Sequence, residues 1–524
     1  MRQPDGTDKD GSIHSLVLRG TASNIVGRCI NLGVWFVVTP VLVHRLGVTE
    51  YGLWALVGTI IVYGALFDFG IGAAVSKYVA EYRARGDLDH ASRLVSTALW
   101  LYLGIGALAV ALSIGLAPFF PDIFNVPPGA RSTASWLVVL AGLTIAVELP
   151  TSTAYAVLRG LQRYEVINVV TSVGMLLLGT SMVVVVLLGG GVLAVAAVNA
   201  PLTLVMQVPM IMAIHRSEPN MRYGWRSPSR ELVRTVASFS AALFFINTAE
   251  RVNTKTDEFV VAGFLPVARV APYSIARRLA ELPQILTLQF INLLLPLASE
   301  LEAAGDRRRV RALYVASTRV TLAIFLPLGV GLMVLAKPVL VAWVGHAYAA
   351  DANVLVVLVA ASLAAMLGWP GSLVLQGIAR HRLLAVFAIP TALLNLALSI
   401  VLVRPLGVIG VALGTLIALS LQSAFFVAYS LRVNSVRAFE LMREAWLPAA
   451  LPVVPMLAVL FGLRALVDPA SWLTVVPVGG AGAAAYVATY LWVGASAGER
   501  QIANRLALAT LHLGPLGVSG SRRR

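Results

Sequence analysis

Apolar stretches long enough to cross a membrane follow one another along almost the whole chain. A transmembrane helix needs about 20 predominantly apolar residues to span roughly 30 Å of hydrocarbon. Hydrophobic residues make up 58% of the chain and charged residues 12%, whereas a soluble domain is about 25% charged. We therefore predict an all-α, polytopic membrane protein, and we exclude a water-soluble enzyme and a disordered chain. The fourteen predicted transmembrane helices lie at residues 21–44, 51–75, 94–117, 134–157, 166–188, 192–214, 236–262, 270–295, 312–336, 352–376, 384–403, 407–430, 446–467 and 472–494.

The sequence contains no pattern typical of covalent or metal chemistry. Its single cysteine, Cys29, lies in the first predicted span, so no internal disulfide can form. The polar residues 1–15 are not followed by the short apolar core and cleavage site of a secretory signal. Neither a zinc-ligand pattern nor a nucleophile elbow is present, and the run Gly189–Gly191 is predicted to be a turn between two spans. We expect no catalytic residue, no metal, no cofactor and no nucleic-acid partner.

Positive charge alternates along the chain in a way that predicts its orientation. The chain carries 40 Lys and Arg against 25 Asp and Glu, a formal net charge of +15. Connections after even-numbered spans hold 20 of the positive residues, and connections after odd-numbered spans hold six. Because Lys and Arg concentrate in cytoplasmic loops, we predict cytoplasmic termini in a bacterial inner membrane. The run Arg307–Arg309 belongs to this topology signal, with contact to anionic lipid head groups as an additional role.

The two halves of the chain contain matching segments. Residues 80–95 (AEYRARGDLDHASRLV) align with 299–314 (SELEAAGDRRRVRALY) at an offset of 219, and LRGLQR at 158–163 aligns with LQGIAR at 375–380 at an offset of 217. Both offsets link a span with the span six later, which indicates two parallel six-helix lobes, an arrangement common in secondary transporters. The predicted organisation is a cytoplasmic N-terminal tail (1–20), an N-lobe (21–215), a cytoplasmic linker (216–235), a C-lobe (236–431), two extra C-terminal helices (432–495) and a basic cytoplasmic tail (496–524).

Several short motifs occur in an order typical of one group of transporters. They are Leu46-Gly47, Tyr51-Gly52, Asp68-Phe69-Gly70, Asp257, Tyr273-Ser274-Ile275-Ala276, Arg278-Leu279, Trp343-Val344-Gly345 and Gly377-Ile378-Ala379-Arg380. Across roughly residues 20–435 the chain resembles the polysaccharide and lipid-linked oligosaccharide exporters of the multidrug/oligosaccharidyl-lipid/polysaccharide superfamily. The resemblance implies two six-helix lobes that form a V around a central cavity and work by alternating access. The two extra C-terminal spans are similar to those of lipid II flippases.

Six positive residues are predicted to lie inside spans, where a charge is costly and usually faces a cavity or a partner. They are Arg28, Arg251, Lys255, Arg277, Arg278 and Arg319. Helical spacing places Arg28 in one stripe with Asn24 and Asn31, and Arg277 in another with Tyr273 and Glu281. The resemblance places these spans on the inner walls of the V. Arg28, Lys255, Arg277 and Arg278 would then form a cationic cavity, supplemented by Arg251, Asn24 and Asn31.

Acidic residues in the spans are predicted to order this cavity or to couple it to protons or sodium. They are Asp68, Glu148, Asp257, Glu258 and Glu281. Structural roles remain open for several of these charges. Arg277 and Glu281 could form an (i, i+4) pair, Asp68 and Glu148 could each be satisfied by a buried hydroxyl or backbone group, and Arg319 could extend to the nearby interface.

The cationic cavity predicts an anionic cargo, because a guanidinium binds phosphate through two parallel hydrogen bonds. We expect a transporter that flips or exports a polyprenyl-pyrophosphate-linked oligosaccharide for surface polysaccharide assembly, with polymerase or assembly proteins as further partners. Two alternatives stay open: a lipid II flippase of peptidoglycan synthesis, and a drug/cation antiporter of the same superfamily. An enzyme is not expected, since the longest connection predicted outside the cytoplasm, about residues 118–133, holds only Asp122 as an acid.

Overall fold

A computed structural model gives the structure of the chain. It describes residues 7–222, 224, 227–238, 256–291, 294–380, 382–467, 470–496 and 498–501, and the side chains of residues 7–26, 28, 29, 382 and 385 lie outside that description. Every regular element among the described residues is helical, as the apolar stretches predict. The described helices fall into two compact units. One comprises the residues up to Arg277 together with Ala385–Ala418, and the other comprises Arg278–Leu384 and the residues from Leu419 onward.

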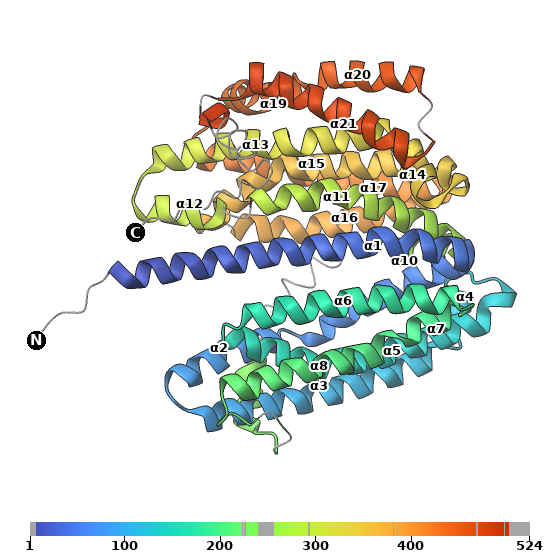
Figure 1. Cartoon of the computed structure of the whole chain (residues 1–524), viewed down its shortest axis with the longest axis vertical. Coiled ribbons are helices and arrows are strands. Elements are labelled where there is room, and N and C mark those ends of the chain that lie inside the picture. Colours follow the sequence, from blue (N-terminus) through green and yellow to red (C-terminus); the bar gives the residue numbers. More distant parts are fainter. Residues whose placement is uncertain are drawn as a thin grey trace, which may run out of the picture. The chain divides into compact units, whose positions relative to one another are not determined.

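The first unit is a bundle of long antiparallel helices, in which α3, α5 and α8 run side by side (Figure 1). A core of buried Ala, Val, Leu and Ile side chains joins α2, α3, α5, α6 and α8. Its elements are α1 (Thr7–Gly64), η1 (Ala65–Asp68), α2 (Ile71–Ala84), α3 (Leu88–Leu116), α4 (Phe120–Ile123), η2 (Pro128–Ala130), α5 (Arg131–Gly160), α6 (Tyr164–Leu187), α7 (Val192–Ala197), α8 (Asn199–Ser217), α10 (Asp257–Phe264) and η3 (Val267–Arg269). The unit also includes the start of α11 (Val270–Ile291), most of α16 (Arg382–Leu406) and the first part of α17 (Val408–Val433).

The second unit is built around α13, which packs against α12, α15, α20 and α21. Tyr314 of α13 is fully buried in a cluster that also contains Val374 and Leu441. Besides the remaining parts of α11 and α17, its elements are α12 (Leu294–Ala303), α13 (Arg307–Val334), α14 (Ala336–Val344), η4 (His346–Asp351), α15 (Ala352–Gly377), α18 (Ala438–Leu441), the π-helix η5 (Met442–Trp446), α19 (Leu447–Ala450), α20 (Val453–Leu466), α21 (Trp472–Thr489) and the π-helix η6 (Tyr490–Gly494).

Twelve helical segments of the described chain are long and apolar enough to cross a membrane. They are Ile30–Asp68, Leu88–Leu116, Pro128–Gly160, Tyr164–Leu187, Val192–Ser217, Val267–Ala303, Arg307–Val334, His346–Gly377, Val386–Leu406, Val408–Val433, Ala438–Leu466 and Trp472–Gly494. The polytopic all-α prediction is therefore confirmed. The count of fourteen stays a prediction, because most of the predicted span 236–262 lies outside the described residues and the predicted spans 21–44 and 51–75 overlap one segment.

Glycine conformations explain how the predicted first and second spans differ from the structure. Gly47 interrupts α1 with φ 76° and ψ 173°, so two helices meet there without an intervening loop. A residue with a side chain adopts such a positive φ only at a cost, which glycine avoids. The second predicted span also ends early. Phe69 and Gly70 have φ of 48° and 83°, and these left-handed residues separate η1 from α2 beside Asp68.

The matching sequence segments have matching backbones. Gly86 and Gly305 have φ of 72° and 70°, and the next residue in each copy, Asp87 or Asp306, caps the following helix by accepting a hydrogen bond from a backbone N–H 3.1 or 3.0 Å away. At the second match the non-glycine residues Gln162 and Ala379 have φ of 60° and 57°. The sequence repeat is thus also a repeat of local structure.

The repeated turns share a close helix–helix contact. A Cβ added to Gly160 would lie 2.7 Å from the carbonyl oxygen of Ser76, and one added to Gly377 would lie 2.8 Å from that of Leu295. Ser76 and Leu295 differ by the same 219 residues as the first matching pair. Equivalent helices therefore approach each other at equivalent places in each copy.

Candidate functional site

Two buried carboxylates begin α10. Asp257 is 2% exposed and Glu258 is 5% exposed, and both occupy the first turn of the helix. The partial positive charge at a helix N-terminus favours acidic side chains there. That local preference does not by itself offset the cost of removing two charges from water, so partners for them are expected.

Arg277 and Tyr273, one turn apart on α11, supply those partners. Arg277 Nη1 donates to Asp257 Oδ2 at 2.7 Å, and the Tyr273 hydroxyl donates to the same oxygen at 2.6 Å. Arg277 Nε lies 3.9 Å from Glu258 Oε1. The structure therefore brings together Asp257, Glu258 and Arg277, three of the predicted site residues. The (i, i+4) spacing of Tyr273 and Arg277 is what allows both to reach one carboxylate.

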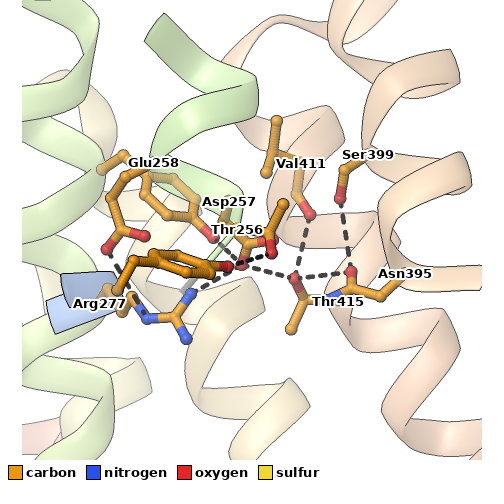
Figure 2. A network of polar contacts seen from close by, with 10 residues as sticks. Thr256, Asp257, Glu258, Arg277, Asn395, Ser399, Val411 and Thr415 are labelled. Atoms are coloured by element: carbon orange, nitrogen blue, oxygen red, sulfur yellow. Dashed lines mark hydrogen bonds and ion pairs between the residues drawn. The ribbon is translucent and has the colours of Figure 1, made fainter. Parts of the chain in front are cut away.

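Helices α16 and α17 extend this network with neutral oxygen atoms. Thr415 Oγ1 lies 3.0 Å from Asp257 Oδ2 and 3.3 Å from Asn395 Oδ1, and Ser399 Oγ lies 3.4 Å from that amide oxygen. Thr415 Oγ1 is also 3.3 Å from the carbonyl oxygen of Val411. Figure 2 shows these contacts as a chain that leads from Asp257 to Thr415 and from there to Asn395 and Ser399.

Helix α1 also contacts the start of α10, through Tyr63. The hydroxyl oxygens of Tyr63 and Thr256 are 2.7 Å apart, and the rings of Tyr63 and Phe259 are 5.3 Å apart between centroids. Residues from α1, α10, α11, α16 and α17 therefore share one polar network within the first unit. We call Tyr63, Thr256, Asp257, Glu258, Tyr273, Arg277, Asn395, Ser399, Val411 and Thr415 the Asp257 network.

The composition of the Asp257 network defines what it could bind. Two carboxylates and one guanidinium leave one formal negative charge, surrounded by hydroxyl, amide and carbonyl oxygens. Hard cations prefer such oxygen ligands, and broken transporter helices coordinate sodium with similar groups. No three His, Cys, Asp or Glu side chains in the described part of the chain come together as a metal site. A proton or a monovalent cation at Asp257 fits this ligand set.

Sequence analysis missed the α16 and α17 members of the network, although a signal for them existed. Asn395 and Ser399 are four residues apart in a predominantly apolar predicted span. Polar residues at that spacing share one helix face. The predicted site was built around spans that carry charged residues, and the neutral groups of spans without charges were therefore not included.

Other predicted site residues do not join the Asp257 network in the structure. Asp68 accepts hydrogen bonds from the Tyr102 hydroxyl and from the backbone N–H of Gly72, which is 3.1 Å away. The alternative of a buried hydroxyl partner therefore describes Asp68. Glu148 lies partly buried on α5, and its carboxyl group has no hydrogen-bond or ion-pair partner among the described residues.

The remaining predicted residues are placed only in part. Arg278 and Glu281 are half-buried on α11, and Asn31 is exposed on α1. Asn24 and Arg28 lie on α1, but their side chains are outside the described part, as are Arg251 and Lys255 altogether. Arg319 pairs with Glu499 at 3.1 Å, and its extension to the interface stays a prediction. The cationic cavity as a whole stays a prediction.

Two solved structures have a fold similar to that of this chain. A lipid II flippase, MurJ, in an inward closed conformation matches with a TM-score of 0.69 and 18% identity over 90% of this chain and 98% of that one. An inward-facing multidrug resistance transporter of the MATE family, in the MOP superfamily, matches with a TM-score of 0.64 and 16% identity over 78% of this chain and 98% of that one. The chain therefore shares the fold of these two solved structures.

Sequence comparisons identify the family. The chain belongs to the polysaccharide biosynthesis protein family, whose model matches residues 41–353. The succinoglycan biosynthesis transport protein ExoT of Rhizobium meliloti (strain 1021) is 23% identical over 64% of this chain, and the match spans 63% of that relative's length. A protein of Haloferax volcanii named as a probable low-salt glycan biosynthesis flippase, Agl15, is 19% identical over 86% of this chain and 90% of its own length. The resemblance inferred from short motifs is confirmed.

Proposed function

We propose that this chain flips or exports a lipid-linked oligosaccharide across the inner membrane for surface polysaccharide assembly. Family membership supports a role in polysaccharide biosynthesis, and the transporter fold supports movement of a cargo through alternating access. The observation that carries the proposal is the Asp257 network, because buried charges within transmembrane helices mark transport or coupling sites. In this scheme the described chain performs no covalent chemistry on its cargo.

The cargo would be a polyprenyl-pyrophosphate-linked glycan, held by its phosphates. Arg28, Lys255 and Arg278 remain the proposed phosphate ligands, supplemented by Arg251 and the asparagines Asn24 and Asn31. We assign Arg277 a different role, because its guanidinium is already shared by two buried carboxylates. Outward movement of negative charge is assisted by an inside-negative potential, by about 2.3 kcal/mol per charge per 100 mV.

Arg277 suggests how an ion could drive the cycle. A proton or sodium ion at Asp257 would neutralise the charge that Arg277 now balances, so ion and guanidinium would compete for Asp257 Oδ2. A ligand shifts a conformational equilibrium only through its different affinity for the two states. We propose that ion binding favours the state in which Arg277 has left Asp257. Asp257 and Glu258 would thus act in coupling, and Asp68 and Glu281 in ordering the surrounding helices, with Glu148 as a further titratable group.

The test is flipping by the purified full-length chain in proteoliposomes. The substrate would be a fluorescent undecaprenyl-pyrophosphate oligosaccharide, and its transfer would be followed by dithionite quenching on the outside. The wild-type chain should equilibrate the lipid between leaflets, whereas Asp257→Asn and Arg28→Ala should abolish transfer. Asp122→Asn is the matched control for Asp257, since it removes one carboxylate from an exposed pair with Arg131. Transfer by Arg28→Ala at the wild-type rate would remove that residue from the phosphate site.

The same vesicles distinguish the alternative functions. A lipid II flippase is favoured by the extent of the match to MurJ, which covers 90% of this chain, and it would transfer lipid II in preference to other glycan lipids. A drug/cation antiporter would instead move a cationic dye against a sodium or proton gradient. Transfer of lipid II alone, or of the dye alone, would replace the proposed cargo.

A further inference from the structure

A pocket of about 390 Å³ lies at one end of the helices of the second unit. It is lined by Glu302, Arg307, Arg308, Val310, Arg311, Ile378, Arg380, Val433, Asn434 and Ser435. Each of these residues lies at or just beyond the end of a candidate transmembrane segment, namely Val267–Ala303, Arg307–Val334, His346–Gly377 or Val408–Val433. The pocket is therefore at the depth where a helix leaves the hydrocarbon and meets the phosphates of the lipid head groups.

The pocket is strongly positive. Four of its lining residues are arginines, and Glu302 is the one acid among them. Arg311 is committed to Glu440, with Nε 3.1 Å from Oε1. Arg307, Arg308 and Arg380 make no ion pair with any residue that the structure describes. Three guanidinium groups therefore remain available at the pocket.

The adjacent arginine provides an internal contrast. Arg309 does not line the pocket, and its Nε lies 3.2 Å from Asp306 Oδ2. The two arginines that precede it in the same helical turn line the pocket, while Arg309 is neutralised beside it. Helix α13 also directs its N-terminus toward this region, because Arg307 is its first residue, and the helix dipole adds positive potential there.

Topology alone does not explain why these charges are clustered. In the matching segment of the first unit, 219 residues earlier, Leu88 and Asp89 stand where the second copy has Arg307 and Arg308. Both copies have the same Gly-Asp turn and cap at this place, so the turn does not require the arginines. The preference of Lys and Arg for cytoplasmic loops depends on the summed charge of a loop. It does not require those residues to line one pocket. The cluster therefore indicates a ligand.

We propose that this pocket binds the phosphate of an anionic membrane lipid. A guanidinium group donates two parallel hydrogen bonds to phosphate oxygens, and Asn434 and Ser435 add neutral polar atoms to the pocket. Basic pockets between transmembrane helices are known to bind lipid head groups. A soluble phosphate presents the same chemistry, but the position at the helix ends favours a ligand already in the bilayer. On the predicted orientation it comes from the cytoplasmic leaflet. The site is distinct from the Asp257 network and does not depend on the proposed cargo.

The experiment compares four versions of the full-length chain in nanodiscs. They are the wild type, the triple variant Arg307→Gln/Arg308→Gln/Arg380→Gln, the control Arg309→Gln and the single variant Glu302→Gln. The thermal midpoint of each is followed as phosphatidylglycerol replaces phosphatidylcholine, since a ligand that binds the native state raises it. A second arm adds inorganic phosphate or pyrophosphate to discs of phosphatidylcholine alone. The midpoint in phosphatidylcholine alone reports whether each variant is folded.

The expected result has a direction for every variant. Apparent affinity for phosphatidylglycerol should fall roughly fivefold for each pocket arginine removed, and it should rise for Glu302→Gln, which removes the opposing charge. Arg309→Gln should change it by less than about twofold, because that arginine is paired outside the pocket. An equal loss in Arg309→Gln would overturn the pocket assignment. Stabilisation by soluble phosphate without stabilisation by phosphatidylglycerol would overturn the lipid as ligand.

Discussion

The charge balance of the Asp257 network predicts an asymmetry between two substitutions. Among the residues that the structure describes, Arg277 pairs with both buried carboxylates, at 2.7 Å from Asp257 and 3.9 Å from Glu258. Arg277→Gln removes a cation that lies beside two neighbouring carboxylates. Asp257→Asn instead leaves Arg277 opposite Glu258. Arg277→Gln should therefore destabilise the fold more than Asp257→Asn does, although each removes one member of the same ion pair.

Magnitudes follow from the burial of the groups. Removing one partner of a buried ion pair costs about 3–5 kcal/mol, which we expect for Arg277→Gln. Loss of one hydrogen bond between charged groups costs about 1.5–3 kcal/mol, which we expect for Asp257→Asn. In the double variant Asp257 no longer carries the charge that Arg277 neutralised. The double variant should then lose about as much unfolding free energy as Arg277→Gln alone. The sum of the two single losses should therefore exceed the loss in the double variant by about 2 kcal/mol.

Reversible unfolding in mixed micelles, followed by circular dichroism, measures these free energies. Asp122→Asn and Arg131→Gln are the matched controls, because the Asp122 and Arg131 side chains are 66% and 51% exposed and the pair should contribute no more than about 1 kcal/mol. Additivity of Asp257→Asn and Arg277→Gln within about 0.5 kcal/mol would refute the reasoning. A cost of Arg277→Gln no larger than that of Arg131→Gln would refute it as well.

Three further predictions test other contacts. Thr415→Val should cost about 1 kcal/mol through the lost hydrogen bond and should reduce the sodium or proton dependence of transport, measured as initial rate in proteoliposomes under imposed gradients. Tyr102→Phe should cost about 1.5–3 kcal/mol, because it removes the hydrogen bond that the buried Tyr102 hydroxyl donates to the charged Asp68 carboxylate, and an unchanged unfolding free energy would contradict this contact. Gly160→Ala and Gly377→Ala should each cost about 1–3 kcal/mol by overpacking, whereas Gly104→Ala, with open space around its Cβ, should be neutral or slightly stabilising in the same assay.

Apolar length made the fold class predictable from sequence, because a bilayer allows few alternatives to helices for such segments. Local conformation was harder to predict. The sequence LGVTEYG contains a glycine at 47 in a polar connection, and such a glycine can lie in a loop or in a sharp break. The structure joins the two helices at Gly47 with no loop. The predicted span 51–75 extends beyond the helical segment that ends at Asp68. Nothing in its hydropathy marks the left-handed residues Phe69 and Gly70.

The three charged residues of the Asp257 network were predictable because charge in a span is conspicuous. Asp257, Glu258 and Arg277 stand out in apolar surroundings, and their costs in a membrane imply partners. Spacing within one helix could not show that Arg277 pairs with Asp257 on another helix. Asn395 and Thr415 are common neutral residues, and only tertiary contact distinguishes them from those that satisfy their own helix backbone.

The repeated turns allow the two copies of the matching segment to be compared position by position, and each copy is one row of that alignment. At Gly160 and Gly377 a neighbouring backbone oxygen occupies the place of a side chain, and both rows retain glycine. At Gln162 and Ala379 the backbone is left-handed in both rows, yet the residues differ and neither is glycine. Steric exclusion has thus fixed the amino acid where unfavourable backbone geometry has not. Variants of this chain should tolerate substitution at Gln162 and Ala379 and should be destabilised by substitution at Gly160 and Gly377. Comparison of the two copies within one chain is sufficient to rank these positions.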